Sequence, residues 1–316
     1  MTRGLAWLVV MAGTMLWAEL AAAQARKPKL PAGLDPGGVA IAILSTGIDY
    51  RATDIAQRLA RDGEGDLIGW DLVDRDNRPF NAAAAETPLA LGGDADALVR
   101  AMGQPGRRVV PVRIDVRDPV SLAKAASFVA QTPARVVVVP MWTSNADQWA
   151  SFGMAIKAFP DLLFIVAAGD EGRDIDREPV WPAAFGQGNV LVVSAPLAEA
   201  PAQAARPNIG PKTVAAIVEG ADNSRMAAVL AADALAGCGP QLVRRAKGEA
   251  LKQAVLADLA KLQPGSSTPV IERCALGGAS RRKSRLRQKI AVVRARPAEA
   301  VRLCPARSGQ AGRRST

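Results

Sequence analysis

The sequence predicts an α/β domain whose mostly parallel sheet carries helices on both faces, followed by a basic C-terminal extension. Short apolar runs without alternation are typical of strands buried on both faces of a parallel sheet. Segments with helical spacing separate these runs, as right-handed crossover connections require. Apolar residues make up 49% of the 316 residues, which is enough for a sizeable core.

The predicted elements alternate along residues 38–262. A continuous apolar run predicts a strand at residues 39–45, and similar runs predict strands at 108–114, 135–139, 162–168 and 189–195. Helical spacing of apolar residues predicts helices at 53–61, 119–130, 145–159, 225–236 and 248–262. No internal repeat is visible, so we expect one domain over residues 26–265, with residues 266–316 as the extension.

The first 25 residues are typical of a cleaved export signal. Arg3 supplies a positive start, residues 5–17 form an apolar stretch, and small residues at 21–25 suit a signal peptidase. A membrane anchor is the alternative, but Glu19 interrupts the run, which is shorter than the roughly 20 residues that a span needs. We therefore expect a secreted or periplasmic protein, in a compartment where disulfides form.

Histidine is absent from the chain. This excludes Ser-His-Asp and Cys-His activation of a nucleophile, and also zinc bound through imidazole. The three cysteines are too few for a zinc site made of cysteine alone. We expect no cofactor, with calcium as the one alternative, at a cluster of oxygen ligands: Asp71, Asp74, Asp76 and Asn77. Their spacing lacks a full calcium-loop pattern, which favours a polar turn.

The basic charge of the protein is concentrated at its C-terminal end. Residues 266–316 hold 13 basic and two acidic side chains, a net charge of +11, against +10 for the whole chain. The densest basic residues are Arg281, Arg282, Lys283, Arg285, Arg287 and Lys289. A solvated tail explains them, but an arm that binds an anionic envelope polymer is the sharper hypothesis. Tyr and Phe are absent there, so we expect no nucleic-acid partner.

Two cysteines flank this basic stretch. Cys274 and Cys304 are predicted to form a disulfide that closes the stretch into a loop, which would leave Cys238 over. A bond between Cys238 and Cys274 is the alternative, and the sequence does not choose between them.

Four segments, in order, resemble motifs of one protein family. Residues 43–49 (Ile-Leu-Ser-Thr-Gly-Ile-Asp) resemble Val-Ile-Asp-Thr-Gly-Ile-Asp, and residues 68–80 resemble a Gly-Trp-Asp-Phe-Val turn segment. Residues 164–172 resemble Val-Ala-Ala-Gly-Asn-x-Gly, and residues 181–190 resemble the Tyr-Pro-Ala and Asn-Val stretch behind it. Residues 223–228 (Asn-Ser-Arg-Met-Ala-Ala) resemble Gly-Thr-Ser-Met-Ala-Ala. These motifs are those of the subtilisin-like serine proteases (subtilases, peptidase S8), and the resemblance covers residues 38–262.

The resemblance implies a subtilisin-like fold, but it places unusual residues at the catalytic positions. The positions of the family's aspartate, histidine, serine and oxyanion-hole asparagine hold, in that order, Ser45, Gly93, Arg225 and Asp170. The family's substrate-binding Ser-Leu-Gly strand corresponds to Met141-Trp142-Thr143. We expect these three residues and Ser224 to line the old cleft.

These substitutions remove the chemistry of peptide hydrolysis. Arg225 is no nucleophile, and Gly93 has no side chain that takes a proton. An ionised Asp170 would place negative charge where an oxyanion develops. We therefore expect an exported, catalytically inactive pseudoprotease that acts as a binding or scaffold protein, with a protein or peptide partner in the old cleft.

A residual acid endopeptidase is the alternative. The sedolisins share the subtilisin fold and use a glutamate base with an aspartate at the oxyanion position, which Asp170 would match, while Asp94 or Asp96 would lie near the base. Ser224 is the nearby hydroxyl, but it stands one residue before Arg225. One residue turns a helical side chain by about 100°. Ser224 is also a candidate helix N-cap, as is Asn223.

Arg225 and Asp170 carry opposite charges at positions that the implied fold brings together. We expect a buried or half-buried ion pair between them, which would fill the old pocket. Ser45 and Asp170 should both lie at the carboxyl ends of strands, at one edge of the sheet.

Overall fold

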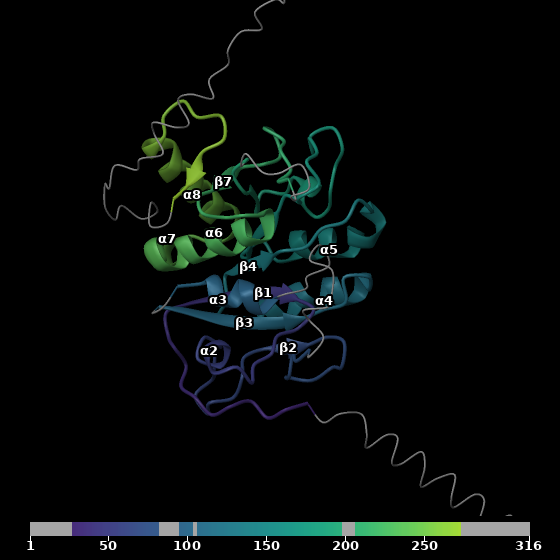
Figure 1. Cartoon of the computed structure of the whole chain (residues 1–316), viewed down its shortest axis with the longest axis vertical. Coiled ribbons are helices and arrows are strands. Elements are labelled where there is room, and N and C mark those ends of the chain that lie inside the picture. The colour runs from purple at the N-terminus through teal and green to yellow at the C-terminus, as the bar shows by residue number, and fades with distance from the viewer. Residues whose placement is uncertain (1–26, 82–94, 104–105, 198–205, 273–316) are drawn as a thin grey trace, which may run out of the picture. The chain divides into compact units, whose positions relative to one another are not determined.

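The computed structural model describes residues 27–81, 95–103, 106–197 and 206–272 (Figure 1). These residues belong to the first of two compact units, Met1–Ala279, and the second unit is Ser280–Thr316. The predicted export signal, Gly93, the basic segment, Cys274 and Cys304 lie outside the described residues. Among the helices that are described, none is both long and apolar enough to cross a membrane.

A parallel sheet with the strand order β2-β3-β1-β4-β5-β6-β7-β8 lies at the centre of the described chain (Figure 1). Its strands are β1 (Val39–Ser45), β2 (Trp70–Asp71), β3 (Arg107–Arg113), β4 (Val136–Val139), β5 (Leu163–Ala167), β6 (Val190–Ser194), β7 (Ala216–Val218) and β8 (Val270–Ile271). Each neighbouring pair runs parallel. The strand order reverses around β1, and in such sheets the crevice beyond the strands' carboxyl ends at this switch point is the usual place for a site.

Helices cover the sheet. All residues of β1, β4, β5 and β6 are buried, which requires cover on both faces. Helices α6 (Ser224–Cys238) and α8 (Gly248–Leu262) both pack on β5 and β6. Helix α4 (Pro119–Ala130) packs against α5 (Ala146–Ala158), and α3 (Ala95–Ala101) packs against α6. The predicted α/β fold class is confirmed.

The long apolar elements follow the sequence prediction closely. The bounds of β1, α4 and α8 are as predicted, and those of β3, β4, β5, β6, α5 and α6 differ by at most two residues. The helix predicted at 53–61 is wrong beyond its first turn, because α2 spans only Thr53–Ala56. The amide of Ala60 donates to the carbonyl of Val109 at 2.8 Å, so the chain leaves the helix to run beside β3.

Short elements escaped the sequence analysis. Five elements have too few residues to show a hydrophobic period: the strands β2, β7 and β8, helix α3 and helix α7 (Pro240–Arg245). Strand β8 pairs with β7 in the register Val218 to Ile271, so the sheet continues beyond the predicted domain boundary at residue 265.

Cys238, the last residue of α6, is disulfide-bonded. Cys274 and Cys304 lie outside the described residues, so the predicted bond between them stays a prediction. The bond between Cys238 and Cys274 stays a prediction, since the partner lies outside the described residues.

Candidate functional site

The start of α6 meets the carboxyl ends of three strands. Ser45 is the last residue of β1, Pro140 follows β4, and Asp170 comes shortly after β5. Because these strands run parallel, all three residues lie at one edge of the sheet, as predicted for Ser45 and Asp170. We call these residues, with Ser224 and Arg225 of α6, the strand-end site.

Ser224 is fully buried in the strand-end site. Its Oγ accepts a hydrogen bond from the amide of Gly169 at 3.0 Å, and its own amide donates to Oδ1 of Asp170 at 2.8 Å. Asn223 is the helix N-cap, because its side chain accepts from the amide of Met226 at 2.9 Å. Ser224 therefore joins α6 to the loop after β5, and its hydroxyl faces no open cleft.

Arg225 is buried as well, with 3% of its surface exposed. Its Nε donates to the carbonyl of Pro140 at 3.1 Å, across 85 residues of sequence. The predicted direct ion pair with Asp170 is not among the ion pairs of the described residues, and the two charges interact through space instead. A long cationic side chain is therefore packed into the fold at the start of α6.

Asp170 is a carboxyl group whose pKa is raised above the ordinary value. Burial is the largest cause, and the nearby charge of Glu171 adds to it. Hydrogen bonds from the amide and side chain of Ser224, and the charge of Arg225, oppose the rise in pKa without cancelling it. The protein thus favours the neutral form of this carboxyl more than water does.

Ser45 uses its hydroxyl to hold a turn. It is 1% exposed, and its Oγ accepts from the amide of Gly47 at 3.2 Å. Gly47 has a φ of 111°, and a Cβ there would lie 2.7 Å from Cβ of Asn81. Only glycine suits this position. The hydroxyl of Ser45 is therefore committed to the backbone.

The segment Met141-Trp142-Thr143, which was expected to line a cleft, is largely buried. Met141 is fully buried, and Trp142 is 5% exposed. The indole Nε1 of Trp142 donates to Glu171. The amide and carbonyl of Thr143 both pair with Trp181, at 3.0 and 2.9 Å. Met141 is therefore a core residue, and the amide and carbonyl of Thr143 already have hydrogen-bond partners.

Asn208 organises the loop after β5, and the sequence analysis did not single it out. It is fully buried, and its Nδ2 donates to the carbonyl of Ala168 at 2.9 Å and to Oε2 of Glu171 at 2.7 Å. Its Oδ1 accepts from the amides of Glu171 and Arg173 at 3.0 and 2.9 Å. A lone asparagine in a loop gives no pattern that would reveal four such partners.

The carboxylates considered for calcium hold side-chain cations. Nζ of Lys27 contacts Asp71, and it lies 2.9 Å from Asp74 and 3.1 Å from Asp76. Arg113 contacts Asp71 at 2.9 Å and Asp74 at 2.6 Å. Over the described residues, no group of three or more acidic, histidine or cysteine side chains is arranged to hold a metal ion.

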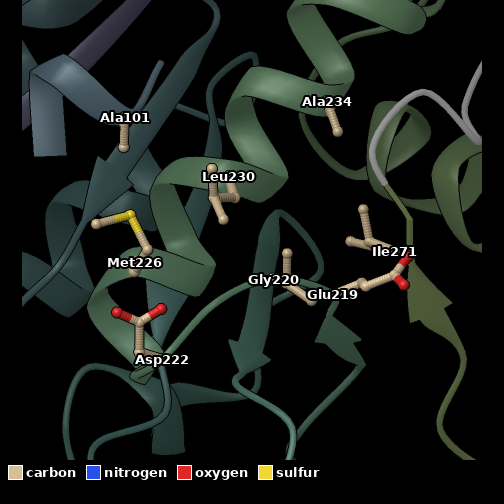
Figure 2. A pocket seen from close by; sticks show the side chains of 9 residues that line it. Ala101, Glu219, Gly220, Asp222, Met226, Leu230, Ala234 and Ile271 are labelled. Carbon is tan, nitrogen blue, oxygen red and sulfur yellow. The ribbon is translucent and has the colours of Figure 1, made fainter. Parts of the chain in front are cut away.

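A pocket lies beside α6, next to α3 and the strands β7 and β8, and Figure 2 shows the side chains that line it. It has a volume of about 290 Å³, and Met226, Leu230 and Ala234 line it at intervals of one helical turn. Ala101 of α3 and Ile271 of β8 close its sides, and Glu219 and Asp222 supply carboxylates. We call it the α6 groove. It offers an apolar stripe with acidic groups beside it.

The strand order, the parallel register and the helix that starts at the strand ends define the subtilisin-like fold. The chain is similar to a solved lanthipeptide protease, with a TM-score of 0.52 and 14% identity over 76% of this chain and 87% of that one. It is also similar to a cold adapted subtilisin-like serine proteinase, with a TM-score of 0.51 and 15% identity over 79% and 93% of the two chains. A third structure, MycP1 without its N-terminal propeptide, gives a TM-score of 0.50 and 18% identity over 76% and 91%.

These identities are low enough that the likeness establishes the fold alone. No protein-family model matches the sequence, and no curated protein matches it. Function must therefore be argued from the residues of this chain.

Proposed function

We propose that this chain is an exported subtilisin-like pseudoprotease that binds a protein or peptide partner and does not hydrolyse peptides. The observation that carries the proposal is the burial of Arg225 at the start of α6. Its Nε donates to the carbonyl of Pro140. A guanidinium cannot attack a carbonyl carbon as a serine hydroxyl does. The hydroxyls of Ser45 and Ser224 are buried and committed to the amides of Gly47 and Gly169.

The missing general base supports the same proposal. A serine hydroxyl is a weak nucleophile until a neighbouring group takes its proton. The chain has no histidine, and the position that resembles the family's histidine is Gly93. The members of a catalytic triad act as a unit, so one restored residue recovers little of the rate.

The first experiment is therefore a hydrolysis assay of the mature protein on casein and on short peptides at pH 4 and pH 8. We expect no turnover at either pH, for the wild type, for Arg225→Ser and for Gly93→His. An active subtilisin assayed in parallel shows that the conditions permit hydrolysis. Turnover at pH 8 that a serine-directed inhibitor blocks would refute the proposal.

An acid endopeptidase is the second candidate, and one observation favours it. Asp170 has a raised pKa and is hydrogen-bonded by Ser224, the arrangement that an aspartic acid at an oxyanion position would need. The burial of Ser224 argues against it, because a nucleophile must reach its substrate. Turnover at pH 4 that Ser224→Ala abolishes would establish this candidate in place of the first.

The α6 groove is the surface that we propose for the partner, in place of the old cleft. Its apolar stripe fits apolar side chains, and the carboxylates of Glu219 and Asp222 fit Lys or Arg next to them. We therefore expect the partner to be a peptide segment that combines apolar and basic residues.

A peptide array of mixed composition, probed with labelled mature protein, tests this surface. Bound peptides should be rich in apolar and basic residues, and Leu230→Glu should lose them, because it places a charge in the stripe. Met154→Glu is the matched control, since Met154 is a 67% exposed apolar residue outside the groove. Equal peptide binding by both variants would exclude the α6 groove.

A further inference from the structure

A second cavity, unrelated to the strand-end site, lies between α8, β6 and the segment 211–215 that precedes β7. Its volume is about 550 Å³, a size that suits a small organic molecule. Its apolar surface comes from four side chains: Val190 and Val192 of β6, Val214 before β7, and Leu256 of α8. We call it the α8 cavity.

The charge of the α8 cavity is positive. Lys212 and Lys252 line it, and no carboxylate is among its lining residues. In the described part of the chain neither lysine takes part in an ion pair. Two acidic groups act on these lysines or their backbone: Glu249, one turn earlier on α8 than Lys252, and Asp176, which accepts from the amides of Lys212 and Thr213 at 2.9 Å each.

Lys252 is the better placed of the two cations. It is half-buried, and burial lowers the pKa of its ammonium, while the charge of Glu249 acts in the opposite direction. A half-buried ammonium without a direct counter-ion has lost water and gained no partner. A bound anion would supply that partner.

The rim of the cavity is held in place. The side chain of Gln263 donates to the carbonyl of Val270 at 2.6 Å and accepts from its amide at 2.7 Å. Oγ of Ser266 donates to the carbonyl of Thr268 at 2.9 Å. The wall that faces α8 is therefore preformed, which reduces the entropy lost when a ligand binds.

We propose that the α8 cavity binds a small carboxylate that carries an apolar side group, with Lys252 as the principal contact of the carboxylate. The ammonium of Lys252 meets the negative end, Lys212 adds to the positive field, and the valines and Leu256 accept the apolar group. The cavity is separate from the α6 groove, so this site is independent of the proposed peptide partner.

Isothermal titration of the mature protein with N-acetyl-leucine and with N-acetyl-leucine amide tests this proposal. The two probes share an apolar group and differ in the charge. We expect the acid to bind at least about tenfold more tightly than the amide, since a charge-assisted hydrogen bond is involved. Equal binding of the two probes, or no binding of the acid at millimolar concentration, would overturn the proposal.

Lys252→Met should reduce the affinity for N-acetyl-leucine to that for its amide. Lys261→Met is the matched control on the same helix, because Lys261 is 75% exposed and pairs with Asp258 away from the cavity. Ala260→Trp is a second variant: Ala260 lines the cavity and is exposed, so tryptophan would block the space without entering the core. Thermal unfolding checks that both variants are folded. If either Lys252→Met or Ala260→Trp keeps the wild-type affinity, the probe binds outside the α8 cavity.

Discussion

At the scale of one residue, Asp170 makes the stability of the strand-end site depend on pH. Its folded-state pKa is raised, mainly by burial. A carboxyl with a raised folded pKa contributes stability below its unfolded pKa, and this contribution is lost as pH rises through the folded pKa. The raised pKa of Asp170 therefore makes the fold less stable at neutral pH than in acid.

Asp170→Asn should accordingly raise the melting temperature at pH 7, because the amide avoids the buried charge and its oxygen still accepts from Ser224. The gain should shrink as pH falls toward 4. Asp176→Asn is the control of opposite sign. Burial raises the pKa of Asp176, but hydrogen bonds from Lys212 and Thr213 lower it further, so its stabilisation is present at neutral pH and lost in acid. A lower melting temperature for Asp170→Asn at pH 7 would contradict the account.

Lys27 is the second residue with a decisive role. Burial disfavours its charge, but hydrogen bonds to Asp71, Asp74 and Asp76 outweigh burial, and its pKa is raised. For a lysine this stabilisation is fully present below the unfolded pKa and is lost as pH rises through the folded pKa, so it operates throughout the neutral range.

Lys27→Met should cost about 2 kcal/mol of unfolding free energy at pH 7, because the buried carboxylate of Asp71 loses one of its two cations and keeps Arg113 and two backbone amides. Urea unfolding measures the cost, and the exposed Lys29→Met is the control. Calcium should leave the melting temperature of the wild type unchanged, since an ammonium occupies the carboxylates. A calcium-dependent rise in the wild type would instead favour a metal site.

At the scale of elements, the loop between β5 and β6 depends on one side chain. Asn208→Ala removes four hydrogen-bonding partners in a fully buried place and leaves the carbonyl of Ala168 without this donor. We expect a loss of about 3 kcal/mol in urea unfolding. Asn145→Ala, which removes the exposed N-cap of α5, should cost about 1 kcal/mol. Similar costs for the two variants would mean that the loop holds its shape without Asn208.

At the scale of the whole molecule, the net positive charge is concentrated in the region after residue 272. We propose that this extension binds an anionic envelope polymer while the folded domain binds its partner.

Heparin serves as the probe of this extension. Retention of the full mature chain should weaken steeply with salt, because binding releases counter-ions in proportion to the charge contacts. Deletion of the residues after Ser280 should abolish that retention, and an unchanged melting temperature would show that the domain remains folded. Equal retention of both forms would reject the extension as the binding element.

The sequence by itself determined the fold class and the absence of histidine chemistry. Strands such as 39–45 and helices such as 248–262 were predictable because burial on both faces and helical periodicity are local patterns. The positions of Ser45 and Asp170 at one edge followed from the parallel order of the strands. The prediction that the triad is lost rests on residue identity, which needs no coordinates.

Only the tertiary structure decided the partners of individual side chains. Arg225 donates to the carbonyl of Pro140, and no direct ion pair with Asp170 is found in the described part of the chain. Lys27 contacts the carboxylates that were considered for calcium, and Cys238 is disulfide-bonded. Lys27 and Asp71 are 44 residues apart, and Arg225 and Pro140 are 85 apart. Such contacts depend on how distant segments pack and on which polar group is left without a partner after burial, and no local period records either.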